Sequence, residues 1–125
     1  ECYFMIGLPT ETEKDILSSI SFAKKLDPNY LKFAITLPFP GTEMFDEMVK
    51  GNRIKSFNWP DYNFSAPRNV YEHDTLSWRR IDYFYAKCHR DFYLRPSYIA
   101  KSLYRSIRSG QFIEHLQALL ATRWF

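Results

Sequence analysis

The sequence predicts a mixed α/β fold, and two observations support this prediction. Two short apolar runs, residues 2–6 and 31–37, flank a segment with helical periodicity. From about residue 76 onward, apolar residues recur at spacings of three and four, which indicates helices. With the short helix expected after the second run, the first 51 residues have the order β-α-β-α. Two strands joined by a helix are expected to be parallel, with a right-handed crossover.

The composition is that of one globular domain of ordinary size. The chain has 125 residues, of which 46% are hydrophobic, 25% charged and 18% aromatic. Its sequence shows neither a signal peptide nor an apolar run of the roughly 18 residues that a membrane span needs. The two cysteines form no Cys-x-x-Cys pair, so a secreted disulfide framework is improbable and a cytoplasmic location is expected.

The first strand, residues 2–6, is uninterruptedly apolar and bounded by Gly7 and Pro9, which is typical of a strand buried on both faces. Thr10 and Glu13 have the spacing of a capping box that begins the next helix. The apolar stripe of this helix has three members: Ile16, Ile20 and Ala23. A strand that starts at residue 2 indicates that the chain is a piece of a longer protein.

The second strand, residues 31–37, is followed by a proline-rich turn at residues 38–41. Thr42 is expected to cap a short helix that ends near Gly51. Residues 52–75 show no period and are punctuated by aromatic side chains. A loop of this length is either functional or a surface loop anchored by its aromatic residues, and the sequence leaves both interpretations open.

The C-terminal region, residues 76–125, is predicted to contain three helices. One helix face of the first carries Trp78, Ile81, Tyr85, Cys88 and Phe92. The second, residues 97–108, is expected to turn three residues inward: Ile99, Leu103 and Ile107. The third, after Gly110, is expected to have four apolar residues along one face: Phe112, Leu116, Leu119 and Leu120. The aromatic residues of this region are interpreted as core or interdomain packing, and Cys88 as a buried thiol.

Two loops follow the two strands, at residues 7–12 and 36–42. Because parallel strands end at the same edge of a sheet, both loops are expected at the edge where α/β proteins bind ligands. A glycine turn against a helix N-terminus suits a nucleotide-like ligand, although an ordinary strand-to-helix turn explains each loop by itself. Glu11 and Glu13 are expected in the first turn of the helix, where acidic side chains favour the helix dipole.

Four segments together resemble a known family. They are FMIGLPTETE at residues 4–13, FAKKLDP at 22–28, FAITLPFPGT at 33–42 and FYLRPSYI at 92–99. The first three resemble the fifth and sixth β/α units of the partial TIM-type barrel of radical S-adenosylmethionine (SAM) enzymes. The fourth resembles the helical tail of the cobalamin-binding branch, which includes the anaerobic magnesium-protoporphyrin ester cyclases. The resemblance implies α/β units of such a barrel in residues 1–51, a loop in 52–75 and a helical tail in 76–125.

The resemblance also implies a role for the two loops in binding the adenosyl part of SAM. Ile6 would pack on adenine, and Gly7 and Pro9 would form the loop that lies beside it. Leu37 and Pro38 would supply apolar and backbone contacts. The usual loop reads Gly-x-Pro-Gly-Glu-Thr, and here Thr10 stands in place of the second glycine.

The motif that would hold the [4Fe–4S] cluster, Cys-x-x-x-Cys-x-x-Cys, does not occur in this sequence. Cys2 and Cys88 cannot replace it, because a cluster needs at least three thiolates close together. By this resemblance the parent protein is an oxidoreductase, cyclase or methyltransferase that uses SAM and a [4Fe–4S] cluster, with cobalamin as a further candidate cofactor. Its partners are the missing N-terminal part of the same protein and a small-molecule substrate. This chain alone is expected to hold no cofactor and to have no catalytic residue.

Two alternatives stay open at this stage. The chain can be a non-catalytic half-barrel that serves as a partner or assembly module. Its basic second half, with 10 Lys and Arg against 5 Asp and Glu in residues 63–125, can also contact a membrane or a lipid-like substrate. No recognised nucleic-acid motif accompanies these charges, so no nucleic-acid partner is expected.

Overall fold

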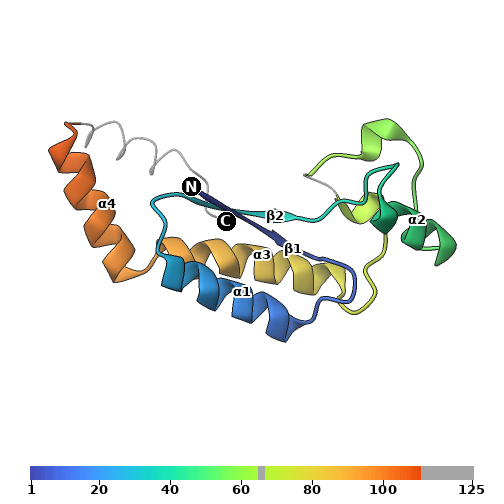
Figure 1. Ribbon diagram of the computed structural model, residues 1–125, viewed down its shortest axis with the longest axis horizontal. Coiled ribbons are helices and arrows are strands. Elements are labelled where there is room, and N and C mark those ends of the chain that lie inside the picture. Colours follow the sequence, from blue (N-terminus) through green and yellow to red (C-terminus); the bar gives the residue numbers. More distant parts are fainter. Residues whose placement is uncertain (65–66, 111–125) are drawn as a thin grey trace.

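The computed structural model describes residues 1–64 and 67–110 and is a mixed α/β structure (Figure 1). Its elements in chain order are β1 (Cys2–Ile6), α1 (Glu13–Leu26), β2 (Leu31–Ile35), α2 (Glu43–Lys50), the 3-10 turns Trp59–Asp61 and Pro67–Asn69, α3 (Trp78–Tyr93) and α4 (Pro96–Arg108). The predicted β-α-β-α order is confirmed. The helix predicted after Gly110, with its four apolar residues, lies outside the described residues.

The two strands pair in parallel and in register, from Cys2 opposite Leu31 to Ile6 opposite Ile35. The second strand is two residues shorter than predicted, because its neighbour turns away at Gly7, where φ is +76°. Thr36 nevertheless still pairs with the first strand, since its backbone N–H donates to the Ile6 carbonyl at 2.8 Å. The strands therefore end side by side, and both loops leave from one edge.

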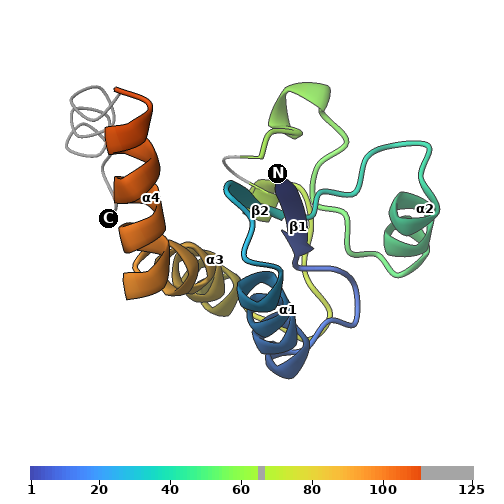
Figure 2. The same cartoon turned by 60° about the vertical axis from the view of Figure 1, so that its left-hand side comes forward.

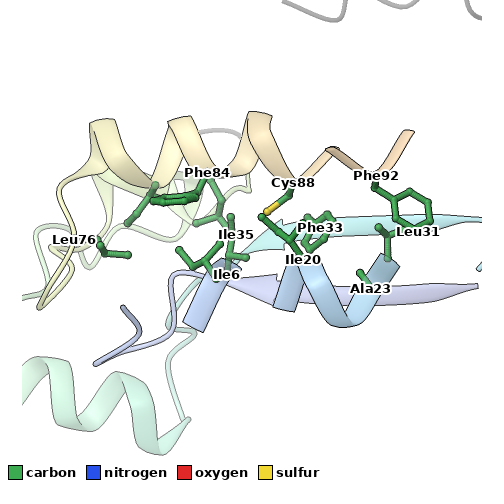
Figure 3. Close-up of a cluster of buried hydrophobic side chains, with 12 residues drawn as sticks. Ile6, Ile20, Ala23, Leu31, Phe33, Ile35, Leu76, Phe84, Cys88 and Phe92 are labelled. Atoms are coloured by element: carbon green, nitrogen blue, oxygen red, sulfur yellow. The ribbon is translucent and has the colours of Figure 1, made fainter. Parts of the chain in front are cut away.

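One face of the sheet is covered by α1 and α3, which lie side by side against it (Figures 1 and 2). Figure 3 shows the core between these layers, where Ile6, Phe33 and Ile35 meet Ile20 and side chains of α3. On the other face of β1, Tyr3 is 68% and Met5 53% exposed. The expectation of a strand buried on both faces is wrong for the chain described here, because only alternate residues of β1 have a layer to pack against.

The N-terminus of α1 lies two residues later than predicted. Thr12 is the N-cap, and its capping box is made with Asp15, whose carboxylate accepts hydrogen bonds from the Thr12 N–H at 2.9 Å and hydroxyl at 2.6 Å. Thr10 does not cap the helix: it has a left-handed backbone, with φ at +64°. The predicted stripe of Ile16, Ile20 and Ala23 is confirmed, since all three are buried.

The second helix begins as predicted, with Thr42 as N-cap and Gly51 at its end. The segment after it folds back, and Ile54 forms an isolated antiparallel bridge with Tyr71. This return encloses a second buried cluster, which consists of Leu37, Met48, Tyr62, Val70 and Tyr71. The residues that showed no period in the sequence therefore pack on the second loop and on α2.

The third helix presents a slightly different face from the predicted one. Ile81, Cys88 and Phe92 are buried as expected, but Phe84 takes the inward place that was assigned to Tyr85. The phenol of Tyr85 carries a hydroxyl that favours water, whereas Phe84 has no polar atom to satisfy. The buried thiol predicted for Cys88 is confirmed.

The fourth helix departs most from expectation, because Ile99, Leu103 and Ile107 are exposed rather than inward. The helix is held to α1 and α3 by residues near its N-terminus, Arg95 and Tyr98. Tyr98 lies on a different side of the helix from the apolar stripe, and Arg95 is the N-cap that precedes the first turn. Their contacts fix which side faces the rest of the molecule. None of the helices in the described part of the chain has the length and apolar character of a membrane span.

We predict that Thr10→Gly stabilises the chain by about 0.5–1 kcal/mol. A β-branched residue is strained at positive φ, whereas glycine adopts this conformation freely. Thermal unfolding followed by circular dichroism measures the change. Thr12→Ala is the control and should cost about 1 kcal/mol through loss of the cap. A lower melting temperature for Thr10→Gly would contradict the explanation.

Candidate functional site

The candidate site is the edge of the sheet at which the two loops meet. The parallel register places Gly7, at the end of β1, beside Thr36, at the end of β2. The Thr36 hydroxyl donates to the Ile6 carbonyl at 3.0 Å, which adds a side-chain bond to the backbone bond between the same residues. The two loops are thus joined before any ligand is present.

A carboxylate of the chain itself occupies the turn of the first loop. The backbone N–H groups of Gly7 and Leu8 both donate to Oε2 of Glu11, at 2.5 and 3.2 Å. The prediction that placed Glu11 in the first turn of the helix is wrong, because α1 begins only at Glu13. Successive backbone N–H groups form a concavity that binds anions. Here the anion is internal, so these amides are not available to an anionic ligand.

The environment of Glu11 shifts the pKa of its carboxyl group. The residue is only 9% exposed, and burial raises the pKa of its carboxyl above the ordinary value. The two backbone hydrogen bonds act in the opposite direction, but burial dominates. The loop is therefore held by a carboxylate that is less stable in its charged form than an exposed one.

One later segment, from Tyr71 to Trp78, crosses both loops. The Tyr71 hydroxyl donates to the Thr36 carbonyl at 2.9 Å, and the Thr75 hydroxyl to the Glu11 carbonyl at 2.5 Å. Trp78 in turn donates its indole N–H to the Tyr71 carbonyl at 3.2 Å. Burial raises the pKa of Tyr71 well above its ordinary value, so its hydroxyl keeps the proton that it donates. We call residues 71–78 the crossing segment.

His73 fixes the crossing segment to the first loop with a defined tautomer. Its Nδ1 accepts from the backbone N–H groups of Thr75, at 3.2 Å, and Leu76, at 3.1 Å. The other ring nitrogen, Nε2, lies 2.8 Å from the Leu8 carbonyl and must carry the proton to donate to it. No local pattern in the sequence predicts the bonds between the crossing segment and the two loops, because they join residues 35 to 65 positions apart.

The predicted cofactor-binding residues do lie together at this edge. Ile6, Gly7, Leu37 and Pro38 are buried, and Pro9 is partly exposed. The Ile6 side chain belongs to the core under the helices, and that of Leu37 to the second cluster. Contact of these residues with adenosine stays a prediction.

The described residues offer no metal centre. Among residues 1–64 and 67–110, no three His, Cys, Asp or Glu side chains are grouped so that they can hold a metal ion. Cys88 is buried, and burial raises the pKa of its thiol to about 12. The residues present therefore do not fit an iron–sulfur cluster, which needs several thiolates at one place.

Comparisons with known proteins find similarity to segments of longer proteins, and no family model matches the chain. An uncharacterized methyltransferase of Pyrococcus horikoshii is 35% identical over 101 residues, which is 81% of this chain and 22% of that protein. The anaerobic magnesium-protoporphyrin IX monomethyl ester cyclase of Rubrivivax gelatinosus is 28% identical over 54% of this chain and 12% of its own length.

A third relative is the bacteriochlorophyllide d C-12(1)-methyltransferase of Chlorobaculum tepidum, which is 31% identical over 49% of this chain and 13% of its own length. The chain thus spans about a fifth or less of the curated relatives that it matches. It is similar to parts of two methyltransferases and of one cyclase, and the similarity to the cyclase agrees with the resemblance that the sequence predicted.

We predict that Tyr71→Phe destabilises the chain by about 1–3 kcal/mol, because the buried Thr36 carbonyl loses its side-chain donor. Urea denaturation measures the free energy of unfolding. Tyr104→Phe removes a hydroxyl from an exposed ring of α4 and serves as the matched control. Equal effects of the two substitutions would show that the crossing segment does not depend on this bond.

We also predict opposite pH dependence at the two acidic residues of this region. The pKa of Glu11 is raised in the folded chain, so its ionisation lowers stability as pH rises from the ordinary glutamate pKa through the raised folded value. Glu13 is paired with Arg80, which lowers the pKa of Glu13, so its contribution is present above the ordinary value and is lost as pH falls through the lowered one.

Urea denaturation between about pH 3 and pH 7 tests this pair of effects. Glu11→Gln, relative to the parent chain, should gain stability as pH rises through its window. Glu13→Gln should lose stability relative to the parent chain as pH rises. Identical pH profiles for the two variants would rule out the burial of the Glu11 carboxyl as the cause.

Proposed function

We propose that this chain is part of a radical SAM enzyme and forms two β/α units of its barrel, with one side of the adenosyl site. The observation that carries the proposal is the parallel pair β1–β2, which ends in two proline-containing loops at one edge. The 35% identity to a methyltransferase runs over 101 residues of the same chain. The parent protein would be a methyltransferase, cyclase or oxidoreductase of this type.

The unpaired strand edges and the exposed face of the sheet support the proposal that the two strands belong to a barrel. Within the described residues, β1 and β2 form a sheet of two strands, so each has an unpaired edge. The helices α1 and α3 lie on one side of the sheet (Figure 2), and Tyr3 and Met5, which point to the other side, are exposed among the residues that the structure describes. In a barrel, neighbouring strands would pair with these edges and this face would turn to the interior. The partner required is the rest of the same polypeptide.

The first loop suits an uncharged ring better than a phosphate. Because Glu11 already occupies the Gly7 and Leu8 amides, a phosphate would meet a carboxylate where other glycine loops offer free donors. Adenosine bound as SAM carries no phosphate. We propose that its ring lies against the backbone of residues 6–9 and 37–38, with Ile6, Leu37 and Pro38 as the apolar support beneath.

The chemistry itself would come from groups outside this chain. SAM and a [4Fe–4S] cluster supply a deoxyadenosyl radical when both are bound, and the cluster ligands must lie elsewhere in the parent protein. Cobalamin would likewise need a further domain. The residues of this chain would orient the adenosyl group and exclude water from it, with Gly7 allowing close approach.

For the substrate we propose a small molecule that meets the exposed rings next to the second loop. Phe39 of that loop contacts Trp59 and Phe64, with ring centroids 6.2 and 5.9 Å apart, and both partners are largely exposed. Two of the relatives are named for a magnesium porphyrin ester and a bacteriochlorophyllide. A flat conjugated ring of that kind would suit an aromatic surface.

The proposal predicts that the complete gene encodes Cys-x-x-x-Cys-x-x-Cys upstream of this segment. The complete protein, reconstituted anaerobically with iron and sulfide, should release 5′-deoxyadenosine from SAM when dithionite is added. Gly7→Ala should lower SAM affinity by about tenfold or more, which equals 1.4 kcal/mol. Gly110→Ala has a comparable positive φ at the end of α4 and is the control.

Two outcomes would refute the proposal. One is a complete coding sequence without the three-cysteine motif. The other is a reconstituted protein that neither binds SAM nor forms 5′-deoxyadenosine although its cluster is intact.

A further inference from the structure

The hydrogen-bond ladder between β1 and β2 ends at Thr36, whose backbone N–H donates to the Ile6 carbonyl. In a longer parallel pair of this register, the next bond would run from the Leu8 N–H to the Thr36 carbonyl. The chain turns at Gly7 instead, and the Leu8 N–H donates to the Glu11 carboxylate at 3.2 Å. The Thr36 carbonyl therefore loses its strand partner at the point where the two loops begin.

The hydroxyl of Tyr71 takes the place of that partner. It donates to the Thr36 carbonyl at 2.9 Å, and its oxygen also lies 3.4 Å from the Gly7 carbonyl oxygen. One buried phenol oxygen thus contacts the backbone at the ends of both strands. The peptide unit between Thr36 and Leu37 is planar and trans. A bond that orients its carbonyl therefore also orients the N–H of Leu37, in the opposite direction.

Tyr71 is itself held from outside the two loops. Its backbone forms the isolated bridge with Ile54, and its carbonyl accepts a hydrogen bond from the indole N–H of Trp78 at 3.2 Å. The Trp78 ring also packs edge-on against the Tyr71 ring, with centroids 5.0 Å apart. Because the side chain is fixed independently, it can determine the direction of the peptide groups that it contacts.

Two more side chains of the crossing segment bond to the loops in the same way. The Thr75 hydroxyl donates to the Glu11 carbonyl at 2.5 Å, and Nε2 of His73 donates to the Leu8 carbonyl at 2.8 Å. Like Tyr71, both side chains act on main-chain carbonyls. The crossing segment therefore holds the backbone of the loops, and this backbone is what the proposed adenosyl group would lie against.

We propose that Tyr71 is a positioning residue for the adenosyl group of SAM. Its hydroxyl sets the relative orientation of the backbone at residues 6–9 and 37–38 before the ligand binds. The inference rests on the proposed function and adds to it a residue that lies in neither loop. A site that is already ordered binds more tightly, because less conformational freedom is lost on binding. Loss of the hydroxyl lets the two loops relax and weakens SAM binding.

Tyr71→Phe in the complete protein, reconstituted with its cluster, tests the proposal. We expect the KM for SAM in 5′-deoxyadenosine formation to rise about fivefold or more, with kcat changed less than about twofold. The reacting groups lie outside this chain and keep their places, so only binding is affected. The Kd for SAM, measured by equilibrium dialysis, should rise by the same factor.

Tyr93→Phe is the matched control, because it removes a hydroxyl at the opposite end of the same strand. The Tyr93 hydroxyl bonds to both backbone groups of Leu31, where β2 begins. Tyr93→Phe should lower the free energy of unfolding in urea denaturation, as Tyr71→Phe does. Its affinity for SAM should equal that of the parent protein, since its hydroxyl is far from the loops along the strand.

A second pair of variants decides the matter if Tyr71→Phe does not fold. Thr75 is an exposed residue, and Thr75→Val removes its hydroxyl with little change of shape. This variant should raise the Kd for SAM roughly threefold, because the Glu11 carbonyl loses its donor. Thr75→Ser keeps the hydroxyl and should bind SAM as the parent protein does.

Three results would overturn the inference while the proposed function stands. The first is a folded Tyr71→Phe protein that binds SAM as tightly as the parent protein. The second is an equal loss of SAM affinity in Tyr71→Phe and Tyr93→Phe, which indicates general destabilisation. The third is equal SAM binding by Thr75→Val and Thr75→Ser. A complete parent protein that binds no SAM although its cluster is intact would instead refute the proposed function, and this inference with it.

Discussion

The in-register parallel pairing of β1 and β2 is the constraint on which the rest of the structure depends. It sets Gly7 beside Thr36, so that both loops leave the sheet at one edge. It also divides the side chains of each strand between a face that α1 and α3 cover and a face that they leave open. A slip of one strand by one residue would exchange its two faces and expose either Ile6 of β1 or Phe33 of β2, which are now fully buried.

The candidate site is held together from within by polar contacts that reach across the chain. Glu11 fills the amide concavity of the first loop, and the Tyr71 hydroxyl binds the backbone of the second. Each contact stabilises a loop and at the same time restricts what the loop can bind. Because a carboxylate occupies the amides of this edge, a phosphate has no free donors there, and this agrees with the proposal that the ligand is SAM.

Features that depend on residues close together in the sequence were predicted correctly, whereas features that depend on distant contacts were not. Residues 2–6, the stripe of α1 and the cap at Thr42 were predictable, because each depends on neighbours within about one helical turn or on strand alternation. The pairing of Thr12 with Asp15 was missed because Thr10 and Glu13 offer the same spacing two residues earlier. The stripe of α4 was assigned inward because periodicity identifies an apolar face but does not identify what covers it.

The sequence by itself determined the element order, the parallel pair and the grouping of the two loops, since local propensity and the length of the connecting helix suffice for these. The resemblance to radical SAM enzymes also came from the order of its motifs. Only the tertiary structure decided that the crossing segment binds both loops, that Glu11 occupies the loop amides and that α4 turns its stripe outward. These features depend on contacts between residues far apart in the chain. Such contacts form, and contribute to stability, only when the layers pack together.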